Sequence, residues 1–201
     1  MLEHLILARH GQTEWNVAGR AQGRADSPLT EAGLAQARSL GRTLADLGVT
    51  HIVASPLPRA LHTARIAAEI AGCAVSTDDR LVERSFGTLE GRFVAEAMAD
   101  DPRWMAVLRA TDPSVAADGG ETLHDVAARM LPALEDARAL PHRCVAVLTH
   151  GQSISATLAA LGGQDAARYR HGNCGYTPLS LRDGRLVFDR WNLAVADLAD
   201  A

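Results

Sequence analysis

Four arginine and histidine side chains stand at the ends of three short apolar runs, at Arg9, His10, Arg59 and His150. Arginine offers a planar fork of donors that fits phosphate oxygens, and histidine acts as a nucleophile or proton carrier near neutral pH. These residue types predict a pocket for a phosphate dianion if the fold brings the three run ends together. The pattern alone also fits structural residues that close buried strands.

The elements needed to position these residues are those of an α/β protein. Short apolar runs predict buried strands at residues 2–8, 51–55, 74–77 and 144–149. Apolar residues at helical spacing predict helices at 31–47, 61–71, 122–140 and 154–161. The carboxyl ends of parallel strands meet at one edge of such a sheet, where ligands bind. We therefore expect Arg9, Arg59 and His150 to converge.

The C-terminal part of the chain predicts a different kind of pairing. Apolar runs at 179–181 and 186–188 flank Asp183 and Gly184, a strong hairpin signal. Residues 93–117 have weaker periodicity and two prolines, so we expect one or two short helices there. The expected fold class is α/β: a three-layer α/β/α sandwich with a mostly parallel sheet, an antiparallel edge strand and a small helical cap. We expect a single domain over residues 1–201, with the cap at about 92–118.

Composition excludes several classes of protein. The net charge of −4 argues against a nucleic-acid-binding surface. All 20 basic residues are arginine, which excludes a phosphate-loop lysine, a pyridoxal phosphate Schiff base and a lysine nucleophile. Cys73, Cys144 and Cys174 form no CxxC pair, so we expect neither a disulfide framework nor a zinc site. No apolar run has the length of a membrane span, and the expected location is the cytoplasm.

A carboxylate follows the third predicted strand, at Glu83 in the glycine-punctuated segment 81–91. A phosphate pocket built from arginine and histidine needs one group that donates a proton to the leaving oxygen, and a partly buried carboxyl suits that task. Glu90 and Glu121 are the other acidic candidates, and we expect them to fix loops or cap helices. The remaining histidines lack metal-ligand spacing, so we expect surface or core roles for His4, His51, His62, His124, His142 and His171.

An ordered series of motifs along almost the whole chain resembles the histidine phosphatase superfamily, within it the phosphoglycerate mutase-like phosphatase branch. The motifs are Arg9-His10-Gly11, Gln12-Thr13-Glu14-Trp15-Asn16, Gln22-Gly23, Leu29-Thr30-Glu31-Ala32-Gly33, Ser55-Pro56 with Arg59, Thr63-Ala64, Leu81-x-Glu83, Glu90-Gly91, Gly119-Gly120-Glu121 and Thr149-His150-Gly151. An isolated Arg-His-Gly is a weak signal, whereas this series is very specific.

The resemblance implies a role for each matching residue. His10 would attack phosphorus and carry the phosphoryl group, while Arg9, Arg59 and His150 would hold its oxygens. Glu83 would protonate the leaving alkoxide and later take a proton from water. The resemblance places Asn16, Gln22 and Gly23 around the phosphate or the substrate mouth, and it implies no metal; we expect no cofactor.

Four further residues are candidates for substrate contact. Gly151 adjoins His150, and Gln152 is polar where many relatives carry an apolar or small residue, so it could hold a phosphate or a substrate hydroxyl. Arg84 follows Glu83, and it either touches substrate or is merely solvated. Trp15 either packs or edges the substrate mouth.

The function that we expect is hydrolysis of a phosphomonoester through a phosphohistidine, with a small phosphorylated metabolite as substrate. Phosphoglycerate mutase-type transfer is the alternative, and a non-catalytic phospho-ligand binding module is a third, from another class. The short segment 93–119 holds Arg103 and Arg109 among five acidic residues, which favours water access over transfer. Retention of His10, Glu83 and His150 counts against a binding module, since binding needs no proton donor. The sequence is compatible with a homodimer.

Overall fold

A six-stranded sheet forms the middle layer of the computed structural model, which describes residues 4–195. The strands are β1 (His4–Arg9), β2 (His51–Ala54), β3 (Ala74–Thr77), β4 (Cys144–Thr149), β5 (Tyr176–Arg182) and β6 (Arg185–Val187). They lie in the order β3-β2-β4-β1-β5-β6; the first four are parallel, and β5 and β6 are antiparallel to their neighbours. The mostly parallel sheet with an antiparallel edge is confirmed. Residues 2 and 3 of the first predicted strand lie outside the described residues.

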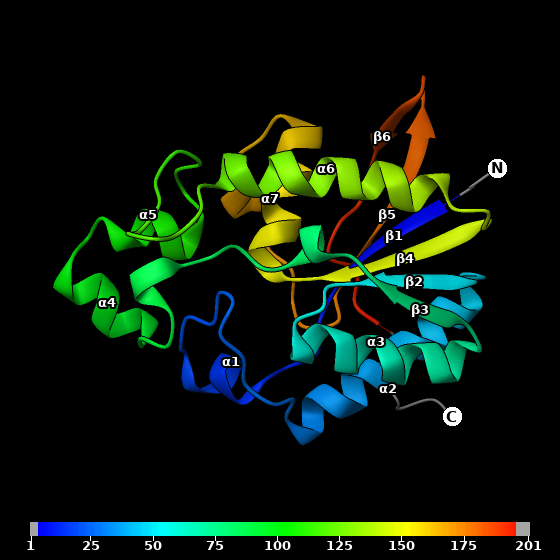
Figure 1. Cartoon of the computed structure of the whole chain (residues 1–201), viewed down its shortest axis with the longest axis horizontal. Helices are drawn as coiled ribbons and strands as arrows, with labels where there is room; N and C mark the ends of the chain where they lie inside the picture. The colour runs from blue at the N-terminus through cyan, green and yellow to red at the C-terminus, as the bar shows by residue number, and fades with distance from the viewer. Residues whose placement is uncertain (1–3, 196–201) are drawn as a thin grey trace.

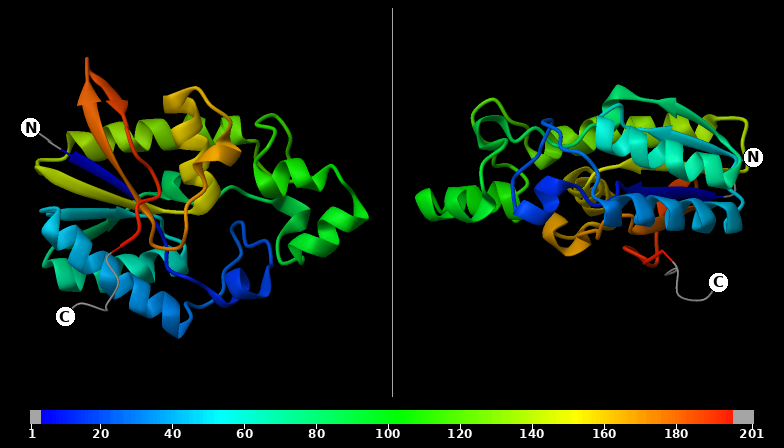
Figure 2. Two further views of the ribbon diagram at one scale, coloured as in Figure 1. Left: turned by 180° about the vertical axis from the view of Figure 1, so that it is seen from behind. Right: turned by 90° about the horizontal axis from the view of Figure 1, so that it is seen from below.

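Helices cover both faces of this sheet (Figures 1 and 2). The longer ones are α2 (Glu31–Asp46), α3 (Pro58–Ala71), α6 (Leu123–Ala139) and α7 (Gly151–Gly162). Alternate side chains of β1 enter opposite cores: Leu5 and Leu7 join the core under α6 and α7, while Ile6 and Ala8 join the core under α2 and α3. This alternation follows from the two-residue period of a strand, and it produces the predicted three layers.

Local sequence explains where the helices begin. The Thr30 hydroxyl caps α2 by accepting from the Gly33 N–H at 3.0 Å, and Thr122 and Asp125 form a capping box at α6. The loop after β1 packs closely on the start of α2. A Cβ at Gly11 would lie 2.6 Å from the Gly33 carbonyl oxygen, so this crossing requires glycine.

Several element boundaries differ from the sequence prediction. Helix α1 (Glu14–Ala18) occupies a segment that we expected to be a polar loop. It has only five residues and no buried ones, so apolar spacing could not reveal it; Thr13 and Asn16 form its capping box. Helix α3 begins at Pro58 rather than residue 61, because proline suits the first turn of a helix. Helix α7 begins at Gly151 rather than residue 154.

Beyond the carboxyl ends of the parallel strands lies the cap, residues 92–118, with α4 (Val94–Asp100) and α5 (Trp104–Arg109) (Figure 1). It has an apolar cluster separate from the two main cores, formed by Ala21, Phe86, Leu89, Ala97, Val107 and Ala117. The short 3₁₀ helices are η1 (Asp79–Leu81), η2 (Gly87–Leu89) and η3 (Ala166–Tyr169). The predicted small helical cap is confirmed, and it lies at the same end of the molecule as α1 (Figure 2).

Candidate active site

The carboxyl ends of β1, β2 and β4 meet at the edge of the sheet that faces the cap (Figure 1). Strand β4 lies between the other two, and Thr149 at its end pairs with Arg9 of β1. The structure brings His10 and His150 together there, with their ring centroids 5.2 Å apart. Arg59 enters from the first turn of α3, directly after β2. Strand order thus turns residues far apart in sequence into one cluster.

The ring of His10 is oriented by its own neighbour. Its Nδ1 lies 2.7 Å from the Gly11 carbonyl oxygen, which can only accept, so Nδ1 carries the proton and Nε2 keeps a lone pair. Burial, together with the nearby cations Arg9 and Arg59, holds the pKa of His10 well below its ordinary value of 6.5. At neutral pH this imidazole is uncharged and has a free nucleophilic nitrogen.

His150 is fully buried beside it and is oriented by Ser55. Its Nε2 lies 2.8 Å from the Ser55 hydroxyl, which itself accepts from the Leu57 N–H. The serine can therefore donate its proton to Nε2, which leaves the hydrogen of His150 on Nδ1. Burial, and then the charge of Arg59, also holds the pKa of His150 well below 6.5. Its Nδ1 is buried and has no hydrogen-bond partner.

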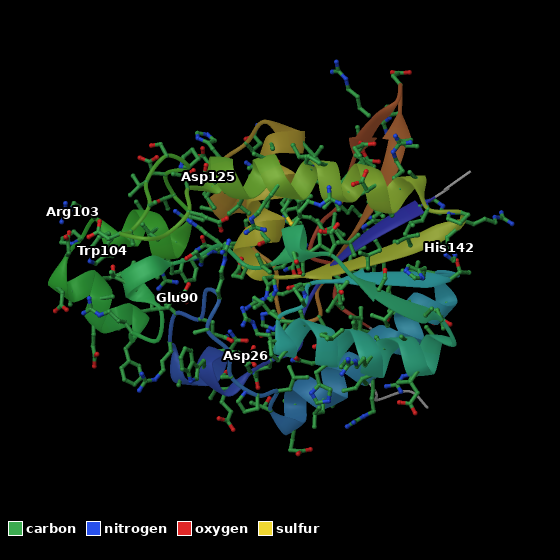
Figure 3. The ribbon with its side chains drawn as sticks, viewed as in Figure 1. Asp26, Glu90, Arg103, Trp104, Asp125 and His142 are labelled. Carbon is green, nitrogen blue, oxygen red and sulfur yellow. The ribbon has the colours of Figure 1, made fainter. Side chains whose placement is uncertain are left out.

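Arg9 and Arg59 bring two guanidinium groups to this cluster, that of Arg59 buried and that of Arg9 partly buried. Arg9 donates through Nη1 to the His171 carbonyl oxygen at 2.5 Å. Arg59 donates through both Nη groups to the loop 23–26, where Asp26 accepts at 3.0 Å (Figure 3). Burial lowers the pKa of both groups, yet arginine remains cationic at neutral pH. The Nε of each is buried without a partner.

The carboxyl group of Glu83 closes the cluster and also caps α7. Its Oε1 accepts from the Arg84 N–H at 2.9 Å and from both the N–H and the hydroxyl of Ser153 at 3.0 Å. Among residues 4–195, its Oε2 accepts only from the Gln152 N–H, at 3.2 Å. Oε2 is therefore the oxygen with capacity left for a proton shared with a ligand. Glu83 is 7% exposed and faces the cavity.

A cavity of about 400 Å³ opens over these side chains. Its deep end is lined by Arg9, His10, Arg59, Glu83 and Gly151. Three buried donors have no partner among the described residues: Arg9 Nε and Arg59 Nε in this lining, and Nδ1 of His150, which does not line the cavity but lies beside His10. Orphaned buried donors are rare in proteins, so a cluster of them indicates a site for anionic oxygens. Next to them stands an uncharged imidazole nitrogen that can attack the centre of such an anion.

Asn16 and Gln22 line the same cavity from the segment around α1. The Asn16 Oδ1 accepts from the Asn173 amide at 3.1 Å, and the Gln22 amide donates to the Thr13 hydroxyl at 2.8 Å. The Gln22 Oε1 is buried without a partner. Both side chains are thus held by α1 and its cap residue, which is how a short helix missed in the sequence contributes to the site.

The two glycines predicted at the site, Gly23 and Gly151, also line the cavity. At each position a side chain would come close to a neighbouring group. Gly23 has φ +55°, and a Cβ there would lie 2.3 Å from the Glu90 carboxylate. Its carbonyl oxygen accepts from Arg59 Nη2 at 2.7 Å. A Cβ at Gly151 would lie 3.4 Å from Arg9 Nε, one of the orphaned donors.

Arg84 takes neither of the positions that we considered, since it is 0% exposed and does not line the cavity. Its guanidinium donates to the carbonyl oxygens of Val107, Val115 and Glu121 and to the Gln152 side chain. Burial lowers the pKa of Arg84 to about 10. Four acceptors supplied by the chain explain why a charged group is tolerated inside the protein. Its role is to join the cap to the body of the protein.

Gln152 lines the cavity, but its polar atoms are already engaged. Its Nε2 donates to the carbonyl oxygens of Val107 at 3.0 Å and Leu108 at 3.2 Å, and its Oε1 accepts from Arg84 at 3.0 Å. The amide that we expected to hold a phosphate or a hydroxyl is thus bound to α5. We call the Arg84 and Gln152 side chains, with the α5 carbonyl groups that they hold, the clasp.

The other acidic candidates serve the loops around the cavity. Glu90 accepts from the backbone N–H groups of Arg24, Ala25 and Phe86. Glu121 pairs with Arg129 at 3.0 Å and with Arg24 at 2.9 Å. Neither carboxylate lines the cavity.

No cluster of three or more histidine, cysteine, aspartate or glutamate side chains that could hold a metal ion occurs within residues 4–195. The cationic groups of the cavity are instead guanidinium groups. Their geometry suits anionic oxygens rather than a metal or a metal-bound cofactor.

Comparison with known proteins decides the family. The sequence model of the histidine phosphatase superfamily (branch 1) matches residues 5–194. The chain belongs to the histidine phosphatase superfamily. It is 36% identical over 196 residues, 96% of this chain and 91% of the relative, to a "Probable phosphoglycerate mutase GpmB" of Proteus mirabilis.

Solved structures place the fold of this histidine phosphatase beside enzymes named as phosphatases. A mycobacterial glucosyl-3-phosphoglycerate phosphatase in complex with VO3 has a TM-score of 0.86 and 35% identity, covering 96% of this chain and all of that one. A phosphoserine phosphatase variant from Entamoeba histolytica, in complex with phosphoserine, has a TM-score of 0.80 and 29% identity, covering 94% and 96%. The α/β fold predicted from the sequence is thus confirmed.

Sequence reasoning about this histidine phosphatase missed several residues that line the cavity, chiefly Arg20, Arg109, Arg170 and His171. His171 had been expected in a surface or core role; it is 5% exposed, and its Nε2 lies 2.7 Å from the Thr177 hydroxyl. Trp15 lines the cavity and also lies under the Arg20 guanidinium, 6.0 Å from its ring centroid. The three arginines carry no motif, so only the assembled fold reveals that they gather at one place.

Proposed function

We propose that this histidine phosphatase hydrolyses a phosphomonoester of a small metabolite through a phosphohistidine on His10. The observation that carries the proposal is the state of His10, whose Nε2 lone pair is free because Nδ1 donates to Gly11. The unpartnered donors of Arg9, Arg59 and His150 stand around it. A neutral nucleophile among donors without a partner is suited to phosphoryl transfer.

In the first step His10 Nε2 attacks phosphorus and the bond to the ester oxygen breaks. Negative charge on the three equatorial oxygens of the transferring group needs fixed donors, which Arg9 Nε, Arg59 Nε and His150 Nδ1 supply. Their positions are set by the buried core rather than by the ligand, so little reorganisation is required. The two arginine cations and the neutral His150 do the work that a metal ion does in other phosphatases, and we propose that the reaction needs no metal.

Glu83 would provide the proton that the leaving alkoxide requires. Its Oε2 faces the cavity with a single contact, from the Gln152 N–H, so it can hold that proton between the carboxyl and the ester oxygen. In the second step water attacks the phosphohistidine, the P–N bond breaks, and Glu83 takes the proton from the water. Inorganic phosphate leaves and both side chains return to their starting state.

Hydrolysis rather than transfer is supported by the mouth of the cavity. Arg109 and Arg170 line it and are exposed, so the mouth is open to solvent. The solved relatives quoted above are named as phosphatases. The acid-rich cap contributes less than the sequence suggested, since none of its five acidic residues lines the cavity. Phosphoglycerate mutase activity remains the second candidate, because the Proteus mirabilis relative carries that name.

Turnover of 3-phosphoglycerate distinguishes the two candidates. The protein should release inorganic phosphate faster than it forms 2-phosphoglycerate, and an alkyl phosphate without a carboxylate should also release phosphate. Formation of 2-phosphoglycerate ahead of phosphate would favour the mutase. Absence of turnover with every phosphate, including an aryl phosphate, would favour a binding module.

The setting that we propose for this reaction is the cytoplasm. Cys73 and Cys174 are free thiols, as is usual in a reducing compartment, and burial raises the pKa of Cys174 to about 12. In the described part of the chain no helix is both long and apolar enough to cross a bilayer.

A further inference from the structure

The cavity contains more positive charge than one phosphate group requires. Five arginines line it, namely Arg9, Arg20, Arg59, Arg109 and Arg170, against a single carboxylate, Glu83. The chain as a whole has a net charge of −4, so this is a local concentration of cations and not a general property. Arg9 and Arg59 lie beside His10 at the deep end. Three arginines remain at the mouth.

Two of these mouth arginines, Arg109 of the cap and Arg170 of a loop, differ from the other arginines of the cap. Arg92 pairs with Asp100, and Arg103 pairs with Asp101 at the outer side of the cap (Figure 3). Arg109 and Arg170 have no hydrogen-bond or ion-pair partner among the described residues, although the protein has more acidic than basic side chains. Side chains left unpaired at a cavity mouth are available to a ligand.

The clasp fixes the backbone that carries Arg109. Gln152 Nε2 holds the carbonyl oxygens of Val107 and Leu108, directly before Arg109, and Arg84 Nη1 also holds that of Val107. A short helix of six residues is thereby tied to the start of α7, next to the phosphate site. The buried cation Arg84 therefore positions an exposed cation, Arg109, over the cavity.

Arg170 is fixed in a comparable way from the other side. The carbonyl oxygen of Tyr169 accepts from the Ser155 hydroxyl at 3.0 Å, and that of His171 accepts from Arg9. The backbone on both sides of Arg170 is thus bonded to the site, and its charge lies near enough to Arg9 to lower the pKa of that group.

Arg20 completes the mouth with a guanidinium that is already positioned. It donates to the Gly91 carbonyl oxygen at 2.7 Å and stacks on the Phe93 ring, 3.9 Å from the centroid. Because Arg20 has a partner while Arg109 and Arg170 have none, the last two are the residues that a ligand would engage first.

We propose that Arg109 and Arg170 form a second anion-binding subsite, so that the physiological substrate is a phosphomonoester with a further carboxylate or phosphate group. The proposal rests on the proposed function, since the first phosphate is taken to lie at His10. Arg9 and Arg59 would bind the phosphoryl group that is transferred, and Arg109 and Arg170 would bind the second anionic group. Charge-assisted hydrogen bonds to two guanidinium groups give both affinity and selection.

Matched substrate pairs test the subsite. Glycerol 3-phosphate and 3-phosphoglycerate differ in a hydroxymethyl against a carboxylate group, and fructose 6-phosphate and fructose 1,6-bisphosphate differ in a second phosphate. The anionic member of at least one pair should have a kcat/KM about 10-fold or more above its partner, mainly through KM, and the difference should shrink at high salt. Which pair responds identifies the second anion as carboxylate or phosphate.

Variants assign the effect to residues. Arg109→Gln and Arg170→Gln should each reduce the preference within the responding pair by about 10-fold. Arg103→Gln, an exposed arginine of the same cap that does not line the cavity, is the matched control and should keep it. Gln152→Met, which loses the contacts to α5 at similar volume, should raise KM for the anionic member more than for its partner.

Two results separate the failure of this inference from that of the proposed function. Equal kcat/KM values within both pairs, with good turnover of an aryl phosphate, would overturn the subsite and leave the phosphatase assignment intact. If no phosphate is turned over, titration calorimetry of the same pairs still tests the subsite, which requires a Kd about 10-fold lower for an anionic member. Equal Kd values would overturn it.

Discussion

The deep end and the mouth of the cavity are built on different principles. At the deep end His10, Arg59 and His150 are at most 2% exposed and stand at strand ends or in the first turn of a helix. At the mouth Arg109 and Arg170 are exposed and unpaired, on the cap and on a loop. Side chains that are buried and held by several contacts suit chemistry that needs fixed charges. Exposed arginines suit selection among ligands. The reaction can thus stay constant while the choice of substrate changes.

The largest expected effect at the deep end comes from His10→Ala. Removing the nucleophile should lower phosphate release by at least about 10⁴-fold, as for other covalent catalysts. Quenched mass spectrometry of the wild-type protein during turnover should find an acid-labile phosphate on His10. His62→Gln, an exposed histidine outside the cavity, serves as the control. Near-normal turnover by His10→Ala would refute the assignment.

Glu83→Gln should show a loss that depends on the leaving group. An alkyl phosphate leaves as a strongly basic alkoxide, so its turnover should fall by about 10²–10⁴-fold. An aryl phosphate leaves as a weaker base, and formation of the phosphoenzyme from it, measured as a burst, should fall much less. Glu135→Gln, on the exposed surface, should change neither. If Glu90→Gln or Glu121→Gln abolishes alkyl turnover while Glu83→Gln does not, the proton donor is misassigned.

Acid should lower the stability of the folded protein through His171, one of the residues that line the cavity. Burial lowers the pKa of His171 to about 4 in the folded protein, against about 6.5 in an unfolded chain. Between these pH values the unfolded chain binds the proton and the folded protein does not. Stability should therefore fall as pH falls from about 6.5 to about 4, by about 3 kcal/mol from this group.

Urea unfolding at pH 7, 5 and 4 measures this effect. His171→Gln should lose less stability between pH 7 and pH 4 than the wild type, because its side chain does not titrate. His62→Gln should follow the wild-type curve. Identical pH dependence in the wild type and His171→Gln would show that other groups, such as His10 and His150, account for the loss.

Removal of metal ions by a chelator should have the smallest effect of all, since it should leave the activity unchanged. The positive charge of the cavity belongs to arginine, and the described residues contain no ligand cluster for a metal. Activity should survive excess EDTA on alkyl and aryl phosphates alike. A loss of activity that a divalent ion restores would contradict the proposed mechanism.

The same contrast explains how much the sequence could reveal. Residues at the deep end follow buried strands. Apolar runs and parallel topology were therefore enough to predict that Arg9, His10 and His150 lie close together. The mouth has no such signal, because an exposed arginine such as Arg109 or Arg170 looks like any solvated one. Helix α1 was missed because a capping box, and not apolar spacing, defines it.

Arg84 and Gln152 escaped prediction for a physical reason of another kind. Gln152 is polar where many relatives carry an apolar or small residue, which suggested contact with a ligand, and Arg84 was expected either to touch substrate or to be solvated. Their partners include carbonyl groups of the cap, supplied by residues more than 20 positions away for Arg84 and more than 40 for Gln152. Only the three-dimensional placement of α5 shows which acceptors satisfy them.

The proposed proton donor, Glu83, also caps a helix, and this has an evolutionary consequence. Its carboxylate accepts the N–H groups of Gln152 and Ser153 and so replaces the side-chain cap that His150 does not provide to α7. Loss of an N-cap typically costs about 1 kcal/mol of stability. A descendant that abandons catalysis would still be under selection to keep an acceptor at this position. Retention of Glu83 in a distant relative therefore reports on folding as well as on activity, whereas retention of His10 reports on activity far more directly.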